Sequence, residues 1–152
     1  MLAMPESDED LPRTVSIGHP NVALITLGPA LPRTVDGYEF IDFWASIEGS
    51  GLKVRTIVRT IEAGTGPLCL SQFVSELADD WRGELPCRDF ESIEHDLSIA
   101  CSRDPLGHVL LRFTLRESYR ADSWAASATA KLDAGEDMAD FAREVRSLLA
   151  SA

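Results

Sequence analysis

The chain has 152 residues, of which 45% are hydrophobic and 26% charged, and its 25 acidic and 14 basic residues give a formal net charge of −11. A chain of this length buries a core without metal or disulfide cross-links, and its composition is that of a globular domain, which excludes wholesale disorder. The negative charge repels a phosphate backbone, so we expect no nucleic-acid partner.

The cysteines and the N-terminal segment indicate the cellular compartment of the protein. Three cysteines, Cys69, Cys87 and Cys101, form no paired motif, as is typical of free thiols in a reducing compartment. The acidic run from Glu6 to Asp10 predicts a flexible acidic tail over residues 1–10, followed by a single domain over residues 11–152. The sequence shows neither a signal peptide nor an apolar run of membrane-spanning length, so we expect a cytoplasmic protein with no membrane partner.

The pentapeptide LPRTV occurs twice, at residues 11–15 and 31–35. A true repeat would carry similarity onward at the same offset, and a sorting motif would need a following glycine and a C-terminal apolar tail, neither of which is present. Each proline fixes φ and keeps the preceding leucine extended, while Thr-Val favours β structure. We therefore expect each copy to lead into a strand.

The first half of the chain predicts a four-strand meander. An apolar strand over residues 22–27 is closed by Gly28-Pro29, and residues 38–48 form a strand with Asp42 and Ser46 on its polar face. Glycines 49 and 51 suit a tight hairpin that returns the chain into a strand over residues 52–62. The residues expected on the core face of the 38–48 strand are Ile41, Phe43, Ala45 and Ile47.

The second half predicts a helix, three strands and a C-terminal helix. Apolar residues at helical spacing over 70–81 end with Trp81, which we expect to be buried, and Gly83 follows as a stop signal. Strands over 97–101, 109–115 and 124–132 precede a helix that begins after Asp133. The short connections favour antiparallel pairing. The fold class is α+β, with a twisted antiparallel sheet of about six to eight strands and two amphipathic helices.

Five segments of the sequence resemble a bacterial family known only as a domain of unknown function (family 6228 type). They are DDWRG, SIEHDL, GHVLLRFTLR, WAASAT and AGEDM, in that order, and the resemblance covers roughly residues 38–150. Phe90 stands where that family often has tryptophan. The layout around the GHV strand is also similar to that of one group of small immunity proteins that neutralise cognate toxins.

Neither the histidines nor the cysteines indicate a metal or catalytic site. The expected hairpin pairs His108 with Ser102, which puts His95 and His108 on the order of 20 Å apart, too far to share a zinc ion. Cys101 alternates with Leu97 and Ile99 on an apolar face, where a thiol behaves as a small hydrophobe. We expect no cofactor and no metal. A site of carboxylates that the fold brings together from separate strands would leave no motif in the sequence, so that alternative stays open.

The sequence marks one kind of surface, formed by basic side chains on strands. Lys53, Arg55 and Arg59 share one strand face, and Arg112 and Arg116 share the outward face of another. They are either a solvated face with cross-strand ion pairs or a binding surface with arginine anchors. Trp81 is assigned to the core, and Arg82 has no assigned role.

Two functions follow from these observations. The first hypothesis is a small protein-binding module without catalysis, of an immunity or adaptor type. The alternative is a small-ligand-binding domain, or a hydrolase with carboxylates brought together by the fold. A deep apolar cleft with convergent titratable groups would favour the alternative, and a flat polar sheet face would favour the module.

Overall fold

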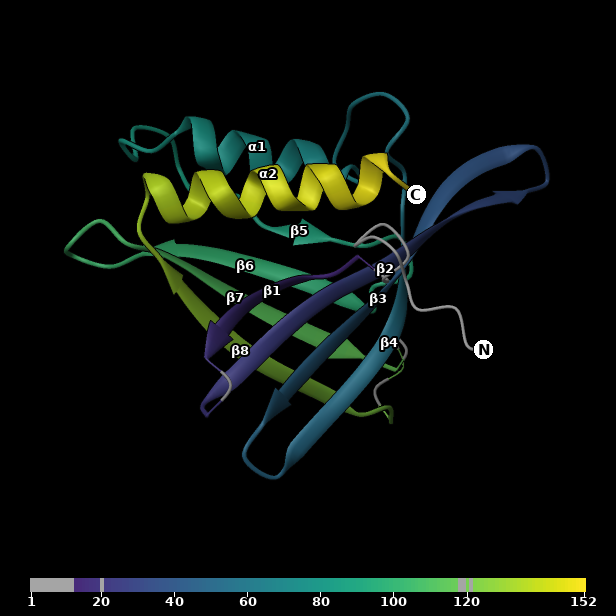
Figure 1. Ribbon diagram of the computed structural model, residues 1–152, viewed down its shortest axis with the longest axis horizontal. Helices are drawn as coiled ribbons and strands as arrows, with labels where there is room; N and C mark the ends of the chain where they lie inside the picture. Colours follow the sequence, from purple (N-terminus) through teal and green to yellow (C-terminus); the bar gives the residue numbers. More distant parts are fainter. Residues whose placement is uncertain (1–12, 20, 118–119, 121) are drawn as a thin grey trace, which may run out of the picture.

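In the part of the chain that the structure describes, eight strands form two four-stranded antiparallel sheets, and two helices lie side by side along one open side between them (Figure 1). The structure is a computed structural model that describes residues 13–19, 21–117, 120 and 122–152. It confirms the α+β class, the antiparallel pairing and the two helices, while dividing the strands between two sheets. The expected acidic tail, residues 1–10, lies outside the described residues. No helix among those residues is long and apolar enough to cross a bilayer.

The first sheet, sheet A, is the expected meander of β1 (Val15–His19), β2 (Ala23–Val35), β3 (Tyr38–Gly49) and β4 (Leu52–Thr60). Strand β2 is longer than predicted, because a register shift between Leu27 and Ala30 lets pairing continue beyond the proline. Gly28 permits this irregularity: its φ is +109°, and a Cβ there would lie 2.5 Å from the carbonyl oxygen of Arg13.

The prediction for the second LPRTV copy was wrong. Residues 31–35 are the last part of β2 itself and pair with the start of β3, across a turn at Asp36 and Gly37. Both turn residues have positive φ, as a two-residue hairpin loop with a type I′ turn requires. This end of the β2–β3 hairpin projects beyond the rest of the fold (Figure 1), and we call residues 31–40 the hairpin arm. In the first copy, Val15 begins β1, and Leu11 and Pro12 lie outside the described residues.

The second sheet, sheet B, contains β5 (Phe90–Glu91), β6 (Leu97–Arg103), β7 (Val109–Arg116) and β8 (Ala125–Leu132). The expected pairing of His108 with Ser102 was wrong by two residues, since Ser102 pairs with Leu110. A wider turn causes the shift: the Asp104 carboxylate accepts the backbone N–H of His108 at 2.8 Å. A shift of two residues keeps every side chain on its predicted face.

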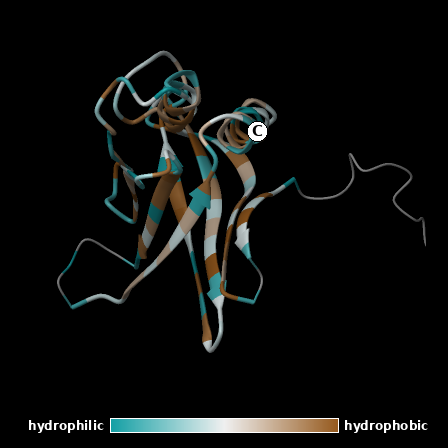
Figure 2. Cartoon of the chain, turned by 90° about the vertical axis from the view of Figure 1, so that its left-hand side faces the viewer, coloured by the Kyte–Doolittle hydropathy of each residue, from teal (hydrophilic) through white to brown (hydrophobic). Residues whose placement is uncertain are grey.

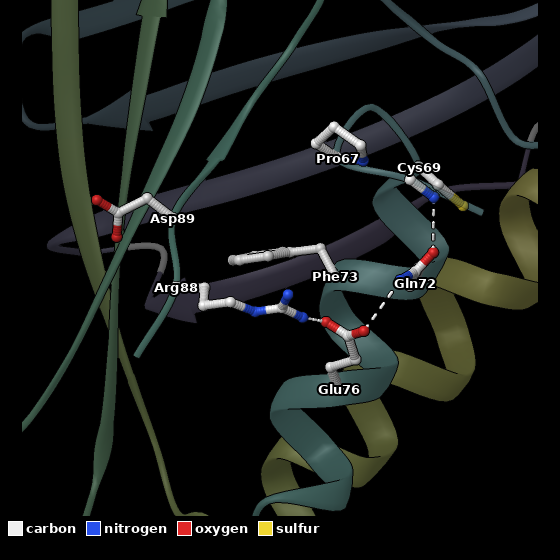
Figure 3. Close-up of a pocket in the computed structure, with 8 residues that line it drawn as sticks. Pro67, Cys69, Gln72, Phe73, Glu76, Arg88 and Asp89 are labelled. Carbon is white, nitrogen blue, oxygen red and sulfur yellow. Dashed lines mark hydrogen bonds and ion pairs between the residues drawn. The ribbon is translucent and has the colours of Figure 1, made fainter. Parts of the chain in front are cut away.

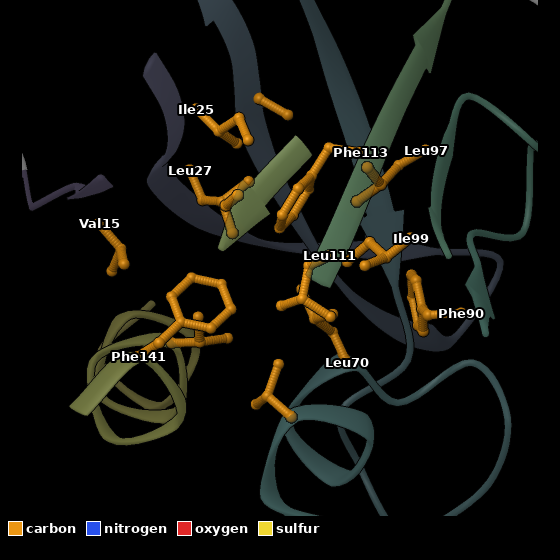
Figure 4. Close-up of a cluster of buried hydrophobic side chains, with 14 of the residues drawn as sticks. Val15, Ile25, Leu27, Leu70, Phe90, Leu97, Ile99, Leu111, Phe113 and Phe141 are labelled. Atoms are coloured by element: carbon orange, nitrogen blue, oxygen red, sulfur yellow. The ribbon is translucent and has the colours of Figure 1, made fainter. Parts of the chain in front are cut away.

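The core lies between the two sheets and beneath the helices (Figure 4). In β3 the predicted core positions Phe43, Ala45 and Ile47 are buried. Two aromatic contacts connect the layers: Phe113 of β7 meets Phe141 of α2 edge-on at 6.3 Å between ring centroids, and Phe73 of α1 lies 5.7 Å from Phe90 of β5. Viewed end-on, the helices sit together above the strands (Figure 2).

Helix α1 (Leu70–Asp79) begins at a carboxylate and ends before Trp81. The carboxylate of Glu62 accepts the backbone N–H groups of Leu70 at 2.9 Å and Ser71 at 3.1 Å. These N–H groups have no partner inside the helix, and a negative charge at this end is favoured by the helix dipole. Helix α2 (Glu136–Ala150) begins three residues after Asp133, in agreement with the sequence.

The predicted burial of Trp81 was wrong. The helix ends at Asp79, and the N–H of Gly83 bonds to the carbonyl oxygen of Asp80 in a turn, so the helical phase that placed Trp81 on the apolar stripe no longer applies. Its side chain is 54% exposed. The Arg82 guanidinium lies 4.9 Å from the centroid of the Trp81 ring. The two residues therefore form a surface stack.

We predict that Trp81→Ala lowers the free energy of unfolding by about 0.5 kcal/mol or less, as for most exposed positions. Phe113→Ala, the matched aromatic truncation in the core, should cost about 3–5 kcal/mol because it leaves a cavity between sheet B and α2. Urea denaturation of the two variants measures both values. Equal losses would show that the tryptophan supports the core.

Candidate functional site

The structure places the five basic residues singled out from the sequence on two opposite surfaces. Lys53, Arg55 and Arg59 lie on the outer face of sheet A, because they alternate with the buried positions of β4. Arg112 and Arg116 lie on the outer face of sheet B, between the buried residues of β7. The inner faces of the two sheets meet in the core. The structure therefore brings the first three together and separates them from the other two.

Arg59 is engaged in an ion-pair cluster around Asp42 of β3. Its Nε donates to Asp42 Oδ1 at 2.8 Å and its Nη2 to Oδ2 at 3.1 Å, while Arg33 Nε donates to Oδ2 at 3.2 Å. Asp42 is only 8% exposed although it lies on the outer face. The hydrogen bonds from Arg59, which outweigh the opposing effect of burial, lower the pKa of Asp42 below its ordinary value. For Arg59, the interpretation as a cross-strand ion pair holds.

Arg55 makes a different contact, with an aromatic ring. Its guanidinium lies 3.7 Å from the centroid of the Trp44 ring, within the range of a cation–π interaction. Ile57 pairs directly with Trp44 across β3 and β4, and its side chain is 46% exposed. We call Trp44, Arg55 and Ile57 the outer patch. It combines an aromatic ring, a cation and an aliphatic side chain on the solvent side of a sheet.

The outer face continues from this patch onto the hairpin arm. Leu31 pairs with Asp42, and Val35 pairs with Tyr38, so all of them share the face that carries Trp44. Leu31, Val35 and Tyr38 are exposed. Apolar side chains exposed together along one strand face, beside cations, are typical of an interaction surface.

The sequence contained a signal for the outer patch that the sequence analysis missed. Trp44 lies between Asp42 and Ser46 in the alternation of β3, on the polar side. A tryptophan on the polar face of a strand, opposite an isoleucine of the next strand, is unusual for a face that only meets water. The pairing of Trp44 with Ile57 follows from the two-residue turn of the β3–β4 hairpin.

On sheet B, Arg116 holds a turn of its own sheet. Its Nη1 donates to the carbonyl oxygen of His95 at 3.3 Å and to the Ser98 hydroxyl at 3.2 Å. Arg112 is exposed on the same face, opposite Ala100 on one side and Thr129 on the other. The neighbours of Arg112 in the ladder are small, unlike those of Arg55.

A groove lies between α1 and the coil of residues 83–89. It has two adjoining parts of about 350 and 690 Å³, and Phe73, Glu76 and Arg88 line both. In Figure 3 the Arg88 side chain points from the coil to Glu76 on the helix, with which it forms an ion pair. The Asp80 carboxylate accepts the backbone N–H groups of Glu84 at 3.0 Å and Leu85 at 3.1 Å. Glu76 and Asp80 are therefore bonded to the coil that forms the groove.

The histidines and cysteines have local partners in the structure. His95 Nδ1 lies 2.5 Å from the Glu91 carboxylate, and His108 Nδ1 lies 2.8 Å from that of Asp104. Burial, followed by the neighbouring Cys87 thiol, raises the pKa of Cys101 to about 12, so this cysteine is a protonated thiol at neutral pH. Among the described residues, no three His, Cys, Asp or Glu side chains are grouped to hold a metal ion.

The fold and the outer face define a two-sheet α+β protein whose outer strands carry exposed cations around a half-buried tryptophan. The chain belongs to a family of unknown function (DUF6228), which it matches over residues 25–152. The match begins within β2 and extends further toward the N-terminus than the motifs that suggested the family. No curated protein and no solved structure matches the chain.

The Asp42 cluster predicts one component of the pH dependence of stability. Because the folded-state pKa of Asp42 lies below its ordinary value of 3.8, this group stabilises the fold above that pH and loses its contribution as pH falls through the folded pKa. Asp42→Asn should therefore lower the free energy of unfolding at neutral pH, with a deficit that shrinks below about pH 4.

The measurement is urea denaturation between neutral pH and the acid limb. Asp36→Asn is the matched control, because Asp36 is an exposed turn residue with positive φ, a conformation that asparagine adopts readily. The control should follow the wild-type curve. A deficit of Asp42→Asn that is constant at all pH values would contradict an electrostatic role for Asp42.

Proposed function

We propose that the protein is a small protein-binding module without catalysis, which binds an acidic surface of a partner protein through the outer face of sheet A. The observation that carries the proposal is the outer patch, where Arg55 stacks on Trp44 beside the exposed Ile57. Tryptophan and arginine, together with tyrosine, are the residue types enriched among those that dominate binding energy at protein interfaces.

The charge of this face supports an acidic partner. Four cations lie on it, Arg33, Lys53, Arg55 and Arg59, against Asp42 and Glu48 of β3 and the nearby Glu94. The chain as a whole carries a net charge of −11. At physiological ionic strength charges are screened over about 8 Å, so a docked partner responds to the local excess of cations more than to the total charge.

The side chains of the face are also fixed before any partner arrives. Trp44 supports the guanidinium of Arg55, and the Asp42 carboxylate holds Arg59 and Arg33. Immobilising a long side chain on binding costs about 0.5–1.5 kcal/mol, and part of this cost is already met in the free protein. The strand scaffold adds rigidity, because β3 and β4 pair without a register shift.

The groove beside α1 favours a second candidate function, binding of a small ligand. Its wider part, about 690 Å³, is in the size range of ligand pockets and has apolar walls that include Leu77 and Leu85. Against this candidate, Glu76 is paired with Arg88, and Asp80 is bonded to the coil. The same bonds occupy two of the carboxylates that the hydrolase alternative would use for a substrate and a water, while Asp79 and Glu84 also line the groove.

The two outer faces provide a matched experiment. Arg55→Glu and Arg112→Glu make the same charge change on opposite faces, and both positions are exposed. We expect both variants to fold like the wild type, because exposed positions contribute little to stability. A partner isolated on the wild-type protein should bind the Arg112→Glu variant equally and the Arg55→Glu variant at least about tenfold more weakly, as loss of an interface hot spot predicts.

Titration calorimetry with the isolated partner measures these affinities, and footprinting of the complex should show protection of Trp44. Wild-type binding should weaken as salt is raised, because the contacts are charged. Equal binding by the two variants, or stronger loss for Arg112→Glu, would refute the assignment of this face. Protection confined to residues 83–89 would instead favour the groove.

A further inference from the structure

Strand β4 leaves one edge of sheet A open. It is the last strand of that sheet, and among the described residues no strand pairs with its other side (Figure 1). Its nine residues make it longer than the edge strands β1, with five residues, and β5, with two. An open strand edge presents unpaired backbone N–H and C=O groups, and these can pair with a further strand.

The register of the β3–β4 hairpin determines which backbone groups point to this edge. A two-residue turn joins the strands, and Gly49 pairs with Leu52 beside the turn. In such a hairpin the pair beside the turn is hydrogen bonded, and bonded pairs then alternate with non-bonded pairs along the strands. The even-numbered residues of β4 therefore bond to β3. The odd-numbered residues direct their N–H and C=O groups to the open edge.

The contact of the next odd-numbered residue agrees with this alternation. Just beyond β4, the N–H of Ile61 forms a hydrogen bond with the carbonyl oxygen of Leu68, outside sheet A, at 3.2 Å. Within the described part of the chain, no such bond is found for the backbone of Lys53, Arg55 or Ile57. The side chains of these three residues are exposed on the outer face. The same residues thus offer both free backbone groups and accessible side chains.

The side chains at the edge favour an acidic strand. Arg59 is paired with Asp42, whereas no ion pair is found for Lys53 or Arg55 with any described residue. The edge therefore presents two cations and then the exposed Ile57 at alternate positions. On an added antiparallel strand, side chains directly opposite these positions would interact with them, so two acidic residues and one apolar residue match the edge.

A second copy of the chain fits this edge poorly. If β4 paired antiparallel with β4 of another copy along most of its length, Lys53 of each chain would lie opposite Arg59 of the other. Like charges directly opposite each other destabilise a sheet, and lysine on an edge strand opposes pairing between copies. The cations therefore disfavour a second copy and favour a strand that carries acidic residues.

We propose that the partner binds through an extended acidic segment, which adds to β4 as a fifth, antiparallel strand of sheet A. This inference rests on the proposed function and adds the form of the partner and the mode of binding. Along its sequence the segment carries an apolar residue opposite Ile57, then acidic residues opposite Arg55 and Lys53, with one residue between each. Backbone hydrogen bonds to the edge supply affinity, and the alternate side chains supply specificity.

A synthetic peptide with blocked ends, Thr-Thr-Val-Thr-Glu-Val-Glu, is the probe for this mode of binding. We expect it to bind the full chain and to slow amide hydrogen exchange at Arg55 and Ile57, measured by NMR. The amides of Val54 and Thr56, which are bonded to β3, should exchange slowly with or without the peptide. Replacing both glutamates by lysine should weaken binding at least about tenfold, because attraction to the cations becomes repulsion.

Methylation of single peptide amides tests the backbone contacts. In the added strand, the N–H groups of the valine opposite Ile57 and of the glutamate opposite Arg55 point to β4, and those of the residues that follow each of them point away. Methylating the first two amides should weaken binding at least about tenfold, because two hydrogen bonds are lost, and methylating the other two should leave it unchanged. Equal effects of the two methylations, or no binding of the unmodified peptide at millimolar concentration, would overturn strand addition.

Two variants of Lys53 separate this inference from the proposed function. Lys53→Pro and Lys53→Ala both remove the charge, but only proline removes the edge N–H, and an edge strand tolerates proline. The partner isolated on the wild-type protein should bind Lys53→Pro at least about fivefold more weakly than Lys53→Ala, because a backbone hydrogen bond is lost and the ring obstructs the added strand.

Thermal melting of the two Lys53 variants shows whether both are folded, and if the proline variant is not, the methylated peptides decide. Equal binding of the partner by the folded Lys53 variants, with binding lost in Arg55→Glu, would overturn strand addition and leave the outer face as the binding surface. Equal binding by all three variants and the wild type would refute both.

Discussion

The packing of the helix pair into the open side between the two sheets is the interaction on which the rest of the structure depends. Phe141 of α2 contacts Phe113 of sheet B, and Phe73 of α1 contacts Phe90 at the edge of the same sheet. Apolar residues of both sheets and both helices join in one buried cluster, and burial of such apolar surface contributes about 25 cal/mol per Å². Since the helices occupy this inner side, the outer faces are left to meet solvent.

This division explains why the outer face of sheet A can differ from the outer face of sheet B. On sheet A, Trp44 lies opposite Ile57 and under Arg55, whereas on sheet B Arg112 lies between Ala100 and Thr129. Cross-strand pairs add only about 0.2–1 kcal/mol each to stability. The Trp44–Ile57 pair therefore contributes little to the stability of a sheet whose inner face is already packed against the core. A half-buried tryptophan with a cation stacked on it, beside the exposed Ile57, fits the binding surface that we propose.

Strand periodicity predicted which face of a sheet each side chain occupies. It did not predict how segments distant in the chain pack against one another. Alternation put Arg55 and Arg112 on outward faces, and the structure agrees even where the β6–β7 register was wrong, because a shift of two residues preserves the face. The predicted burial of Trp81 was wrong because an apolar stripe does not mark where a helix ends. That the two sets of basic residues lie on opposite sheets depends on how the halves of the chain pack, which no local pattern encodes.

The net charge of the protein and the charge of the outer face act at different distances. A net charge of −11 repels the acidic partner that we propose while it is far away, and salt weakens that repulsion. Once the partner is docked, the contact with Arg55 is partly desolvated against the Trp44 ring, where a cation–π or ion-pair interaction is stronger than in water. Raising salt should therefore speed association, as the long-range repulsion is screened, and shorten the residence time by a larger factor, as the local attraction weakens, so that the affinity falls. A surface of this kind selects partners by short-range fit, because distant electrostatic steering works against it.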